Sequence, residues 1–261
     1  TVAVKGEREG ILAKSVGESG LNSDTPSVAL EKRGGTIWAN LMVGPRLAKA
    51  VPLFQNAQLS HMGVKLHGSG FIVEADEFTS LSSQNIIKPF RNGRDIAQRP
   101  RNVKVIDLFD WDIKEVESNY PEIYQRLLDR VKPERDQNRR KYYRDFWWIW
   151  GEPRKELRDA ISGLTRLIAT TRTAKHRTFQ FVTSNVTLES KVVGIAIDEG
   201  KTLAALSSRA HIVYASAFGG WLGVGNDATY NHSECFSPFP FPAFDTLDPA
   251  LVQNLRDLGE R

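Results

Sequence analysis

The stretch ERDQNRRKYYRDFWWIWGEPRKEL, residues 134–157, sets aromatic and basic side chains side by side and holds half of the chain's six tryptophans. A hydrophobic core uses aromatic side chains, whereas charged side chains favour a solvated face. A surface that binds a polyanion uses both. Pro133 is typical of the first turn of a helix and Gly151 of its end, so the pattern predicts one helix that runs to about Trp150.

In such a helix Tyr142, Phe146 and Trp150 recur at i, i+4 and i+8 and share one face, which we expect to be buried. The cations that would then point outward are Arg139, Arg140 and Arg144. The alternative is a solvated helix whose cations are neutralised internally, with Asp136 paired to Arg139 or Arg140.

On both sides of this stretch the chain is typical of an α+β fold, with short-stranded mixed sheets and packed helices. Apolar runs predict strands over 36–44, 85–90, 102–109, 165–170, 177–183 and 191–197. Helical spacing and proline positions predict helices over 121–131, 153–161, 203–217 and 248–261, with Thr202 as a cap for the third of these. Residues 1–35 are expected as loop, and 62–74 as a β-hairpin.

Composition limits the class of protein. The chain has 261 residues, 41% of them hydrophobic, which is enough for a sizeable core. Its net charge of +4 is a mild bias, so the location of the cations matters more than their sum. Cys235 is the only cysteine; we expect a buried thiol and a reducing, cytoplasmic location. No apolar run approaches the ~20 residues that cross a bilayer, so no membrane partner is expected.

Motifs of catalysis are scarce. Gly223 and Gly225 have part of a nucleotide-binding spacing, but they follow an expected helix rather than a strand. The five histidines show no paired metal spacing, and no nucleophile elbow occurs. We therefore expect no catalytic residue and no metal site in this chain.

Basic residues gather in three clusters, at 88–101, 130–144 and 170–177. Lysine and arginine neutralise phosphates and steepen the salt dependence of nucleic-acid binding. The third cluster lies between two apolar runs, where a loop is expected. Such a loop can reach into a major groove and offer arginine to guanine.

Several blocks resemble one family in order along residues 62–242. They are MGVKLHGSGFIV, IIKPFRNGRDI, VKPERDQNRRKYYRDFWWIWGEPRKELRDAI, RLIATTRTAKHRTFQFV and LAALSSRAHIVYASAFGGWLGVGNDATYNHSECFSPFPFP. They resemble the C-terminal target recognition domain of gamma-class adenine-N6 DNA methyltransferases, including the single-chain Type IIG/IIL restriction-modification enzymes. In that family an upstream Rossmann-like domain binds S-adenosylmethionine and carries an Asn-Pro-Pro-aromatic motif.

The resemblance implies a role and a division of the chain. No Asn-Pro-Pro occurs here. We therefore expect a non-catalytic fragment, without a cofactor of its own, of a longer S-adenosylmethionine-dependent enzyme. Residues 1–84 would be a connector and the tail of the methyltransferase domain, 85–245 the recognition domain, and 246–261 a terminal helix. The partners would be duplex DNA and the upstream methyltransferase domain. In the segment FSPFPFPAF we expect Phe236, Phe239 and Phe241 to pack into the core of the recognition domain.

We expect two kinds of contact between this chain and DNA. Loops at the ends of apolar strands supply the candidates for base reading, which are Arg172, Asp198, Glu199 and Lys201. The candidates for the DNA backbone are Arg91, Arg94, Arg139, Arg140, Arg144, Lys175, His176 and Arg177. Two alternatives stay open: an RNA-binding module, and a scaffold whose basic surface docks a partner subunit.

Overall fold

The structure is a computed structural model that describes residues 9–37, 50–74, 76–78, 85–222 and 227–261. Packing divides the chain into two compact units, Thr1–Ala50 and Val51–Arg261. The division by role after residues 84 and 245 stays a prediction. Most of the strand expected over 36–44, and the glycines at 223 and 225, lie outside the described residues.

The first unit contains an antiparallel ribbon of β1 (Gly10–Ser19) and β2 (Ser27–Gly35). The expectation of loop over 1–35 is therefore wrong for these two segments. Nearly every residue of the ribbon is exposed. Because neither face is buried, the sequence carries no alternation of apolar and polar residues from which the strands could be recognised.

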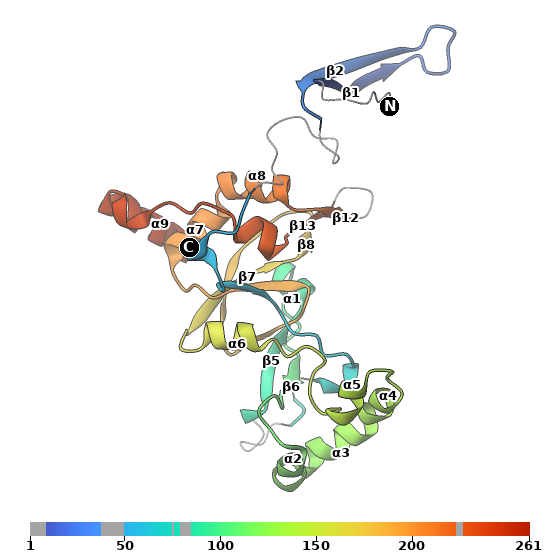
Figure 1. Cartoon of the computed structure of the whole chain (residues 1–261), viewed down its shortest axis with the longest axis vertical. Helices are drawn as coiled ribbons and strands as arrows, with labels where there is room; N and C mark the ends of the chain where they lie inside the picture. The colour runs from blue at the N-terminus through green and yellow to red at the C-terminus, as the bar shows by residue number, and fades with distance from the viewer. Residues whose placement is uncertain (1–8, 38–49, 75, 79–84, 223–226) are drawn as a thin grey trace. The chain divides into compact units, whose positions relative to one another are not determined.

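The described residues of the second unit form three small sheets and several helices, which confirms the predicted α+β class (Figure 1). The first sheet has the order β10 (Thr187–Leu188), β5 (Ile87–Arg91), β6 (Lys104–Ile106), β4 (Ile72–Val73). The second has the order β3 (Ser60–Met62), β11 (Val192–Ile195), β7 (Arg166–Thr171), β9 (Gln180–Thr183). The third has the order β12 (Trp221–Leu222), β13 (Asp227–Thr229), β8 (Thr173–Ala174). Strands β5, β6, β7, β9 and β11 confirm the apolar runs at 85–90, 102–109, 165–170, 177–183 and 191–197.

The hairpin expected over 62–74 is absent. Strand β3 pairs with β11 and β4 pairs with β6, so the two ends of the segment belong to different sheets. Between them the Val64 amide donates to the Leu188 carbonyl over 2.7 Å. Gly63 packs against the Leu188 and Glu189 carbonyls so closely that no Cβ fits there. The segment therefore connects two sheets rather than turning back on itself.

The second sheet is buried on both faces. Ile168 and Val193 pack into one core with α7 (Gly200–Ser207) and α8 (Arg209–Phe218). Leu167 and Val192 pack into another core with α1 (Gly93–Ala97) and α6 (Lys155–Ile161). Figure 1 shows α8 and α6 on opposite sides of β7. Successive strand residues point to opposite faces, so continuous apolar runs fit this arrangement.

The helices confirm most of the predicted segments. Helix α3 (Pro121–Arg130) follows α2 (Ile113–Asn119), and α6 lies within 153–161. The stripe at 203–217 forms α7 and α8, but Thr202 is buried inside α7 and Glu199 occupies the cap position, so the predicted cap is wrong. The terminal helix is α9 (Pro249–Glu260). Among the described helices, none has the length and apolar character needed to cross a membrane.

The predicted helix from 133 to 150 is wrong. It is replaced by α4 (Lys132–Asp136) and α5 (Lys141–Asp145). The side chain of Asn138 accepts a hydrogen bond from the Arg140 amide between them, at 3.0 Å. Because α5 ends at Asp145, the expected shared face does not form: Trp150 is only 2% exposed, whereas Tyr142 and Phe146 are 49% and 42% exposed.

The C-terminal aromatic segment packs as expected. Phe236 and Phe239 are buried, and Phe241 packs against the same core. Cys235 is a buried free thiol, as the composition predicted.

Trp150 is the side chain whose loss we expect to cost most. Its indole N–H donates to the Ile106 carbonyl over 2.9 Å, and its ring lies under the Arg158 guanidinium. Trp150→Ala should lower the free energy of unfolding by about 3–5 kcal/mol, measured by urea denaturation. The control Trp221→Ala, at a 53% exposed tryptophan, should change it by less than about 0.5 kcal/mol. Equal losses in the two variants would contradict the assignment of Trp150 to the core.

Candidate nucleic-acid interface

An open pocket of about 560 Å³ lies where three loops meet. Its lining includes Lys65, His67, Arg94 and Lys191, the acidic Glu189 and the apolar Phe90. Lys65 is paired with Glu152 at 2.7 Å, so Arg94 and Lys191 are, among the described residues, the open cations of the lining. These residues come from the 63–67 connection, the start of α1 and the turn before β11. A concave surface of this size with converging cations is suited to an anionic ligand.

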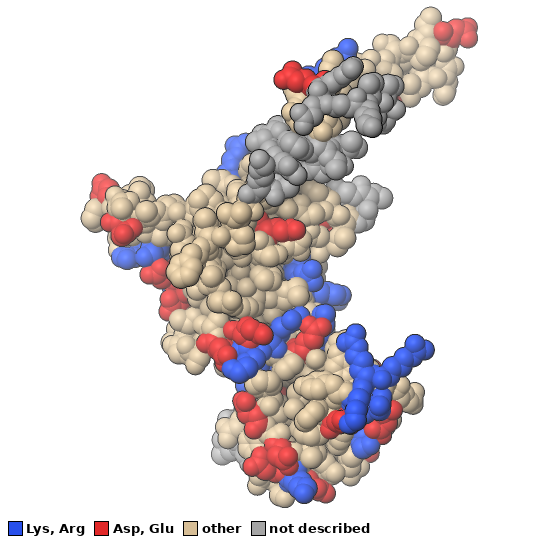
Figure 2. Space-filling model, viewed as in Figure 1, with Lys and Arg blue, Asp and Glu red and all other residues tan. Residues whose placement is uncertain are grey.

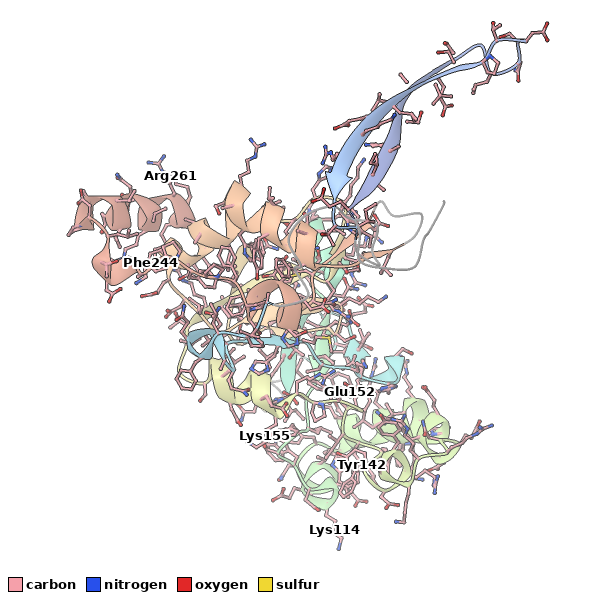
Figure 3. The ribbon with its side chains drawn as sticks, turned by 45° about the horizontal axis from the view of Figure 1, so that its top comes forward. Lys114, Tyr142, Glu152, Lys155, Phe244 and Arg261 are labelled. Carbon is pink, nitrogen blue, oxygen red and sulfur yellow. The ribbon has the colours of Figure 1, made fainter. Side chains whose placement is uncertain are left out.

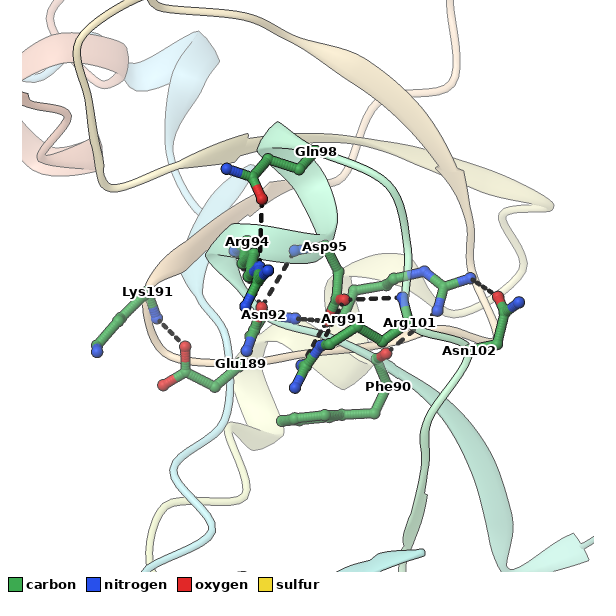
Figure 4. A network of polar contacts seen from close by, with 10 residues as sticks. All are labelled: Phe90, Arg91, Asn92, Arg94, Asp95, Gln98, Arg101, Asn102, Glu189 and Lys191. Atoms are coloured by element: carbon green, nitrogen blue, oxygen red, sulfur yellow. Dashed lines mark hydrogen bonds and ion pairs between the residues drawn. The ribbon is translucent and has the colours of Figure 1, made fainter. Parts of the chain in front are cut away.

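The start of α1 is fixed by a reciprocal cap (Figure 4). Asn92 accepts from the amides of Arg94 and Asp95 at 2.9 and 3.1 Å, and Asp95 accepts from the Asn92 amide at 3.0 Å. The Arg101 guanidinium, 2.8 Å from Asp95, holds the pKa of that buried carboxyl far below its usual value, and the amide hydrogen bonds add to the effect. Arg94 keeps only a 3.2 Å contact with the Gln98 amide oxygen and stays exposed.

Some cations of the first basic cluster, residues 88–101, are paired with buried carboxylates and others are not. Lys88 lies 2.8 Å from the buried Asp107, so its charge and that of Arg101 are compensated within the fold. Arg91 makes only long contacts of 3.4 Å, to the Phe90 carbonyl and the Asn102 side chain. Arg91 and Arg94 are therefore the cations of this cluster that remain for a phosphate.

Arg172 joins this surface from the third cluster. Its amide donates to the Lys191 carbonyl over 2.8 Å, so the backbones of these two basic residues are paired. Burial lowers the pKa of His232 nearby, and His61, Arg172 and Arg154 lower it further. The positive charges of several segments thus act on the same region.

Arg177, by contrast, is held inside the fold. Its guanidinium donates to the carbonyls of Thr171 and Ala228 and lies over the Tyr230 ring, 5.2 Å from the centroid. Lys175 and His176 are exposed. The structure therefore separates the three basic neighbours into one internal clamp and two surface groups.

The segment Asp198–Lys201 lies away from Arg172. Strand β7 pairs with β11 so that Thr171 faces Val192, whereas Ile168 faces Ile195. Residues that follow Thr171 and residues that follow Ile195 are therefore at opposite ends of a strand pair, roughly 17–20 Å apart. The structure does not bring the two base-reading segments together.

The partners of that segment are internal. The Asp198 carbonyl accepts from the Arg166 guanidinium at 2.8 and 3.0 Å. Glu199 and Lys201 form an ion pair with each other at 3.0 Å, and Lys201 also lies over the Phe244 ring.

The second cluster carries exposed arginines at 139 and 140. The alternative, a pairing of Asp136 with these arginines, does not occur, because Asp136 binds Lys132 at 2.6 Å. Arg144 is partly buried and donates to the Asn138 carbonyl over 2.5 Å. Figure 2 shows Lys and Arg side chains gathered over α4 and α5.

Contacts between rings connect this cluster with the pocket. Arg140 lies over the Tyr143 ring, 5.8 Å from the centroid, and Tyr143 contacts the His67 ring at 5.3 Å. We call the resulting surface the basic band; its members are Lys65, His67, Arg94, Arg139, Arg140, Arg172 and Lys191.

Sequence reasoning missed three members of the band, Lys65, His67 and Lys191. Lys65 and His67 form only a pair, and Lys191 follows Glu189 and Ser190, so no local run of cations indicates any of the three. They meet because Gly63 packs on the turn before β11. Among the described residues, the His, Cys, Asp and Glu side chains form no group of three or more that is placed to hold a metal ion.

Comparison with known proteins shows the fold. No family model matches this chain, and no curated protein matches it. Among solved structures, it is similar to the Type IIL restriction-modification enzyme MmeI, whose structure is in complex with DNA. The TM-score is 0.71 at 15% sequence identity, over 98% of this chain and 33% of that one. This chain therefore spans about a third of the length of the enzyme it matches.

The Asp95 cap supports a pH-dependent prediction. Asp95→Asn should lower the free energy of unfolding by about 2 kcal/mol at pH 7, because an ionised carboxylate that accepts several bonds is lost. Since the folded pKa lies below the unfolded value of about 3.9, the stabilisation is present above that pH and is lost as the pH falls further. Urea midpoints at pH 7 and pH 3 measure it: the gap between wild type and variant should narrow at pH 3. The exposed control Asp110→Asn should show no gap; a constant gap for Asp95→Asn would contradict the role of its charge.

Proposed function

We propose that this chain is a duplex-DNA target recognition domain of a restriction-modification enzyme. The observation that carries the proposal is the likeness in fold, over 98% of the chain, to an enzyme solved with DNA. The basic band agrees with it, since its cations come from separate segments and lack carboxylate partners at Arg94, Arg139, Arg140 and Arg172 among the described residues. The finer assignment, to an adenine-N6 methyltransferase, rests on the family resemblance of the sequence blocks.

The band would supply affinity and register through phosphates, while a few side chains read base edges. Arg94, Arg139, Arg140 and the exposed Lys175 and His176 suit the backbone role. Arg91 also suits it, because its contacts are only long ones of 3.4 Å, whereas Arg144 suits it less because it already donates to the Asn138 carbonyl. Arg177 is better explained as an internal clamp that fixes the 171–177 segment.

For base reading we favour Arg172, which stands on the band at the end of β7. Arginine donates two hydrogen bonds to guanine, and a rigid strand end supports such a contact. The candidates Asp198, Glu199 and Lys201 would require DNA to reach the other end of the same strand pair.

The methyl donor and the reaction belong, in this proposal, to a longer chain. S-adenosylmethionine would bind in an upstream methyltransferase domain, and this part would present the site. An RNA-binding module is the alternative with a specific observation in its favour, namely the exposed aromatic rings of Tyr142 and Phe146. A scaffold that docks a partner subunit is not favoured by any particular contact.

Salt dependence tests duplex binding. The chain should bind a labelled duplex in a mobility-shift assay, with affinity that falls steeply between low and moderate salt. Arg94→Glu with Lys191→Glu should weaken all sequences alike and reduce the log–log slope by about 1 per lost phosphate contact. Lys114→Glu on α2 is the matched control, because that side chain extends into solvent outside the band (Figure 3). Binding that does not change with salt, or equal losses in the control, would reject this mode.

Specificity is tested in the longer enzyme. Arg172→Ala should relax one position of the methylated motif, with a loss of about 1–3 kcal/mol on the cognate site only. Lys175→Ala should leave the motif unchanged and lower occupancy at every site. Genome-wide mapping of N6-methyladenine measures both. An unchanged motif in Arg172→Ala defeats its role as a reader, and absence of the modified base in the wild type defeats the methyltransferase assignment.

A further inference from the structure

Two aromatic rings lie exposed beside the basic band, one on α5 and one at its C-terminal cap. Tyr142 and Phe146 are 49% and 42% exposed, and their ring centroids are 5.0 Å apart with 38° between the planes. Tyr142 lies in the short helix α5, and Phe146 is the C-terminal cap that follows its last residue. Burial of such rings is normally favourable, so a pair that stays exposed among cations is a candidate binding surface.

The pair is held on a rigid support. Phe146 contacts the ring of Trp148 at 5.7 Å, and Tyr142 contacts that of Tyr143 at 5.9 Å. Trp148 is 9% exposed and donates its indole N–H to the Trp111 carbonyl over 3.0 Å. The two exposed rings are therefore the outer members of an aromatic cluster that continues into the core.

The charge around the pair is positive and open. Lys141 binds Asp145 and Lys132 binds Asp136, so these charges are compensated. Arg139 and Arg140 have no carboxylate partner within the described part of the chain. Guanidinium groups beside exposed rings can hold a phosphate backbone while its bases lie on the rings.

We propose that Tyr142 and Phe146 form a stacking site for unpaired nucleobases of DNA, with Arg139 and Arg140 binding the adjoining phosphates. The inference rests on the proposed function in taking DNA as the partner. The inference goes beyond that function, because recognition of a duplex reads the edges of the bases and does not use their faces. An unpaired base, by contrast, exposes its face, on which any aromatic side chain can stack.

The experiment compares two probes with equal numbers of phosphates. The first is a fluorescein-labelled oligothymidylate of about ten nucleotides, and the second is the same backbone with abasic sites. Fluorescence anisotropy at fixed salt should give about 5- to 100-fold tighter binding of the oligothymidylate, because stacking needs the base. Tyr142→Leu with Phe146→Leu keeps apolar surface but removes the rings. It should abolish the difference between the probes while leaving abasic binding unchanged.

Further variants separate the contribution of the phosphate contacts from that of base stacking. Arg139→Gln with Arg140→Gln should weaken both probes and lower the salt slope by about 0.7 per contact on a single strand. Tyr142→Phe should retain the preference, and Phe54→Ala, at an aromatic residue 97% exposed outside the band, should change neither probe. Urea denaturation of each variant confirms that it is folded.

Three outcomes would overturn the inference: equal binding of both probes by the wild type, a preference that survives loss of both rings, or tighter binding of an oligouridylate RNA than of the oligothymidylate. Duplex binding is measured in parallel. Duplex bound without a base-dependent preference rejects the stacking site alone, whereas the preference without duplex binding supports the stacking site and rejects duplex recognition.

Discussion

The buried carboxylate of Asp107 holds the second unit together. It receives two bonds of 2.9 Å from Arg158 on α6 and lies 2.8 Å from Lys88 on β5. Burial alone would raise its pKa, but Arg158 and Lys88 together hold that pKa below its usual value. Removal of both partners would leave an uncompensated buried charge, at a typical cost of about 3–5 kcal/mol. The contact joins the core around Trp150 to the core under β7, and the pocket walls come from both.

The sequence predicted the parts of the fold that local patterns determine. Apolar runs such as RLIATT are unambiguous because β7 is buried on both faces. The prediction of one helix across 133–150 was wrong, because the helix boundaries depend on single side-chain hydrogen bonds. One of these runs from the Arg140 amide to the Asn138 side chain, and the periodicity of the sequence does not reveal it. The prediction of a hairpin at 62–74 was wrong because of a tertiary contact: Gly63 packs against the Leu188 carbonyl, which comes from a distant segment of the chain.

The candidate site was predictable only where cations adjoin in sequence. Runs of charge indicated Arg94, Arg139 and Arg172, but not Lys65 or Lys191, which reach the pocket through the crossing of 63–65 over the turn before β11. Nor does a run of charge tell which members are available. Lysine and arginine are long enough to find a carboxylate or a carbonyl inside the fold, and that choice is made by tertiary structure.

The division between compensated and open cations explains why aromatic and basic residues share residues 134–157. Arg135 is 2% exposed, lies near the rings of Phe71 and Tyr143, and donates to the Leu66 carbonyl, so this cation belongs to the core. Burial lowers its pKa, and two of its nitrogens have no acceptor among the described residues, which is a cost to stability. The hydrogen bond from Arg135 holds the backbone of Leu66 in place, and Leu66 lines the pocket beside Lys65 and His67. A buried arginine thus fixes the wall on which exposed cations stand. The mixture in the sequence reflects two layers of one structure: a core layer of tryptophans and Arg135, and a surface layer of Arg139, Arg140 and two open rings.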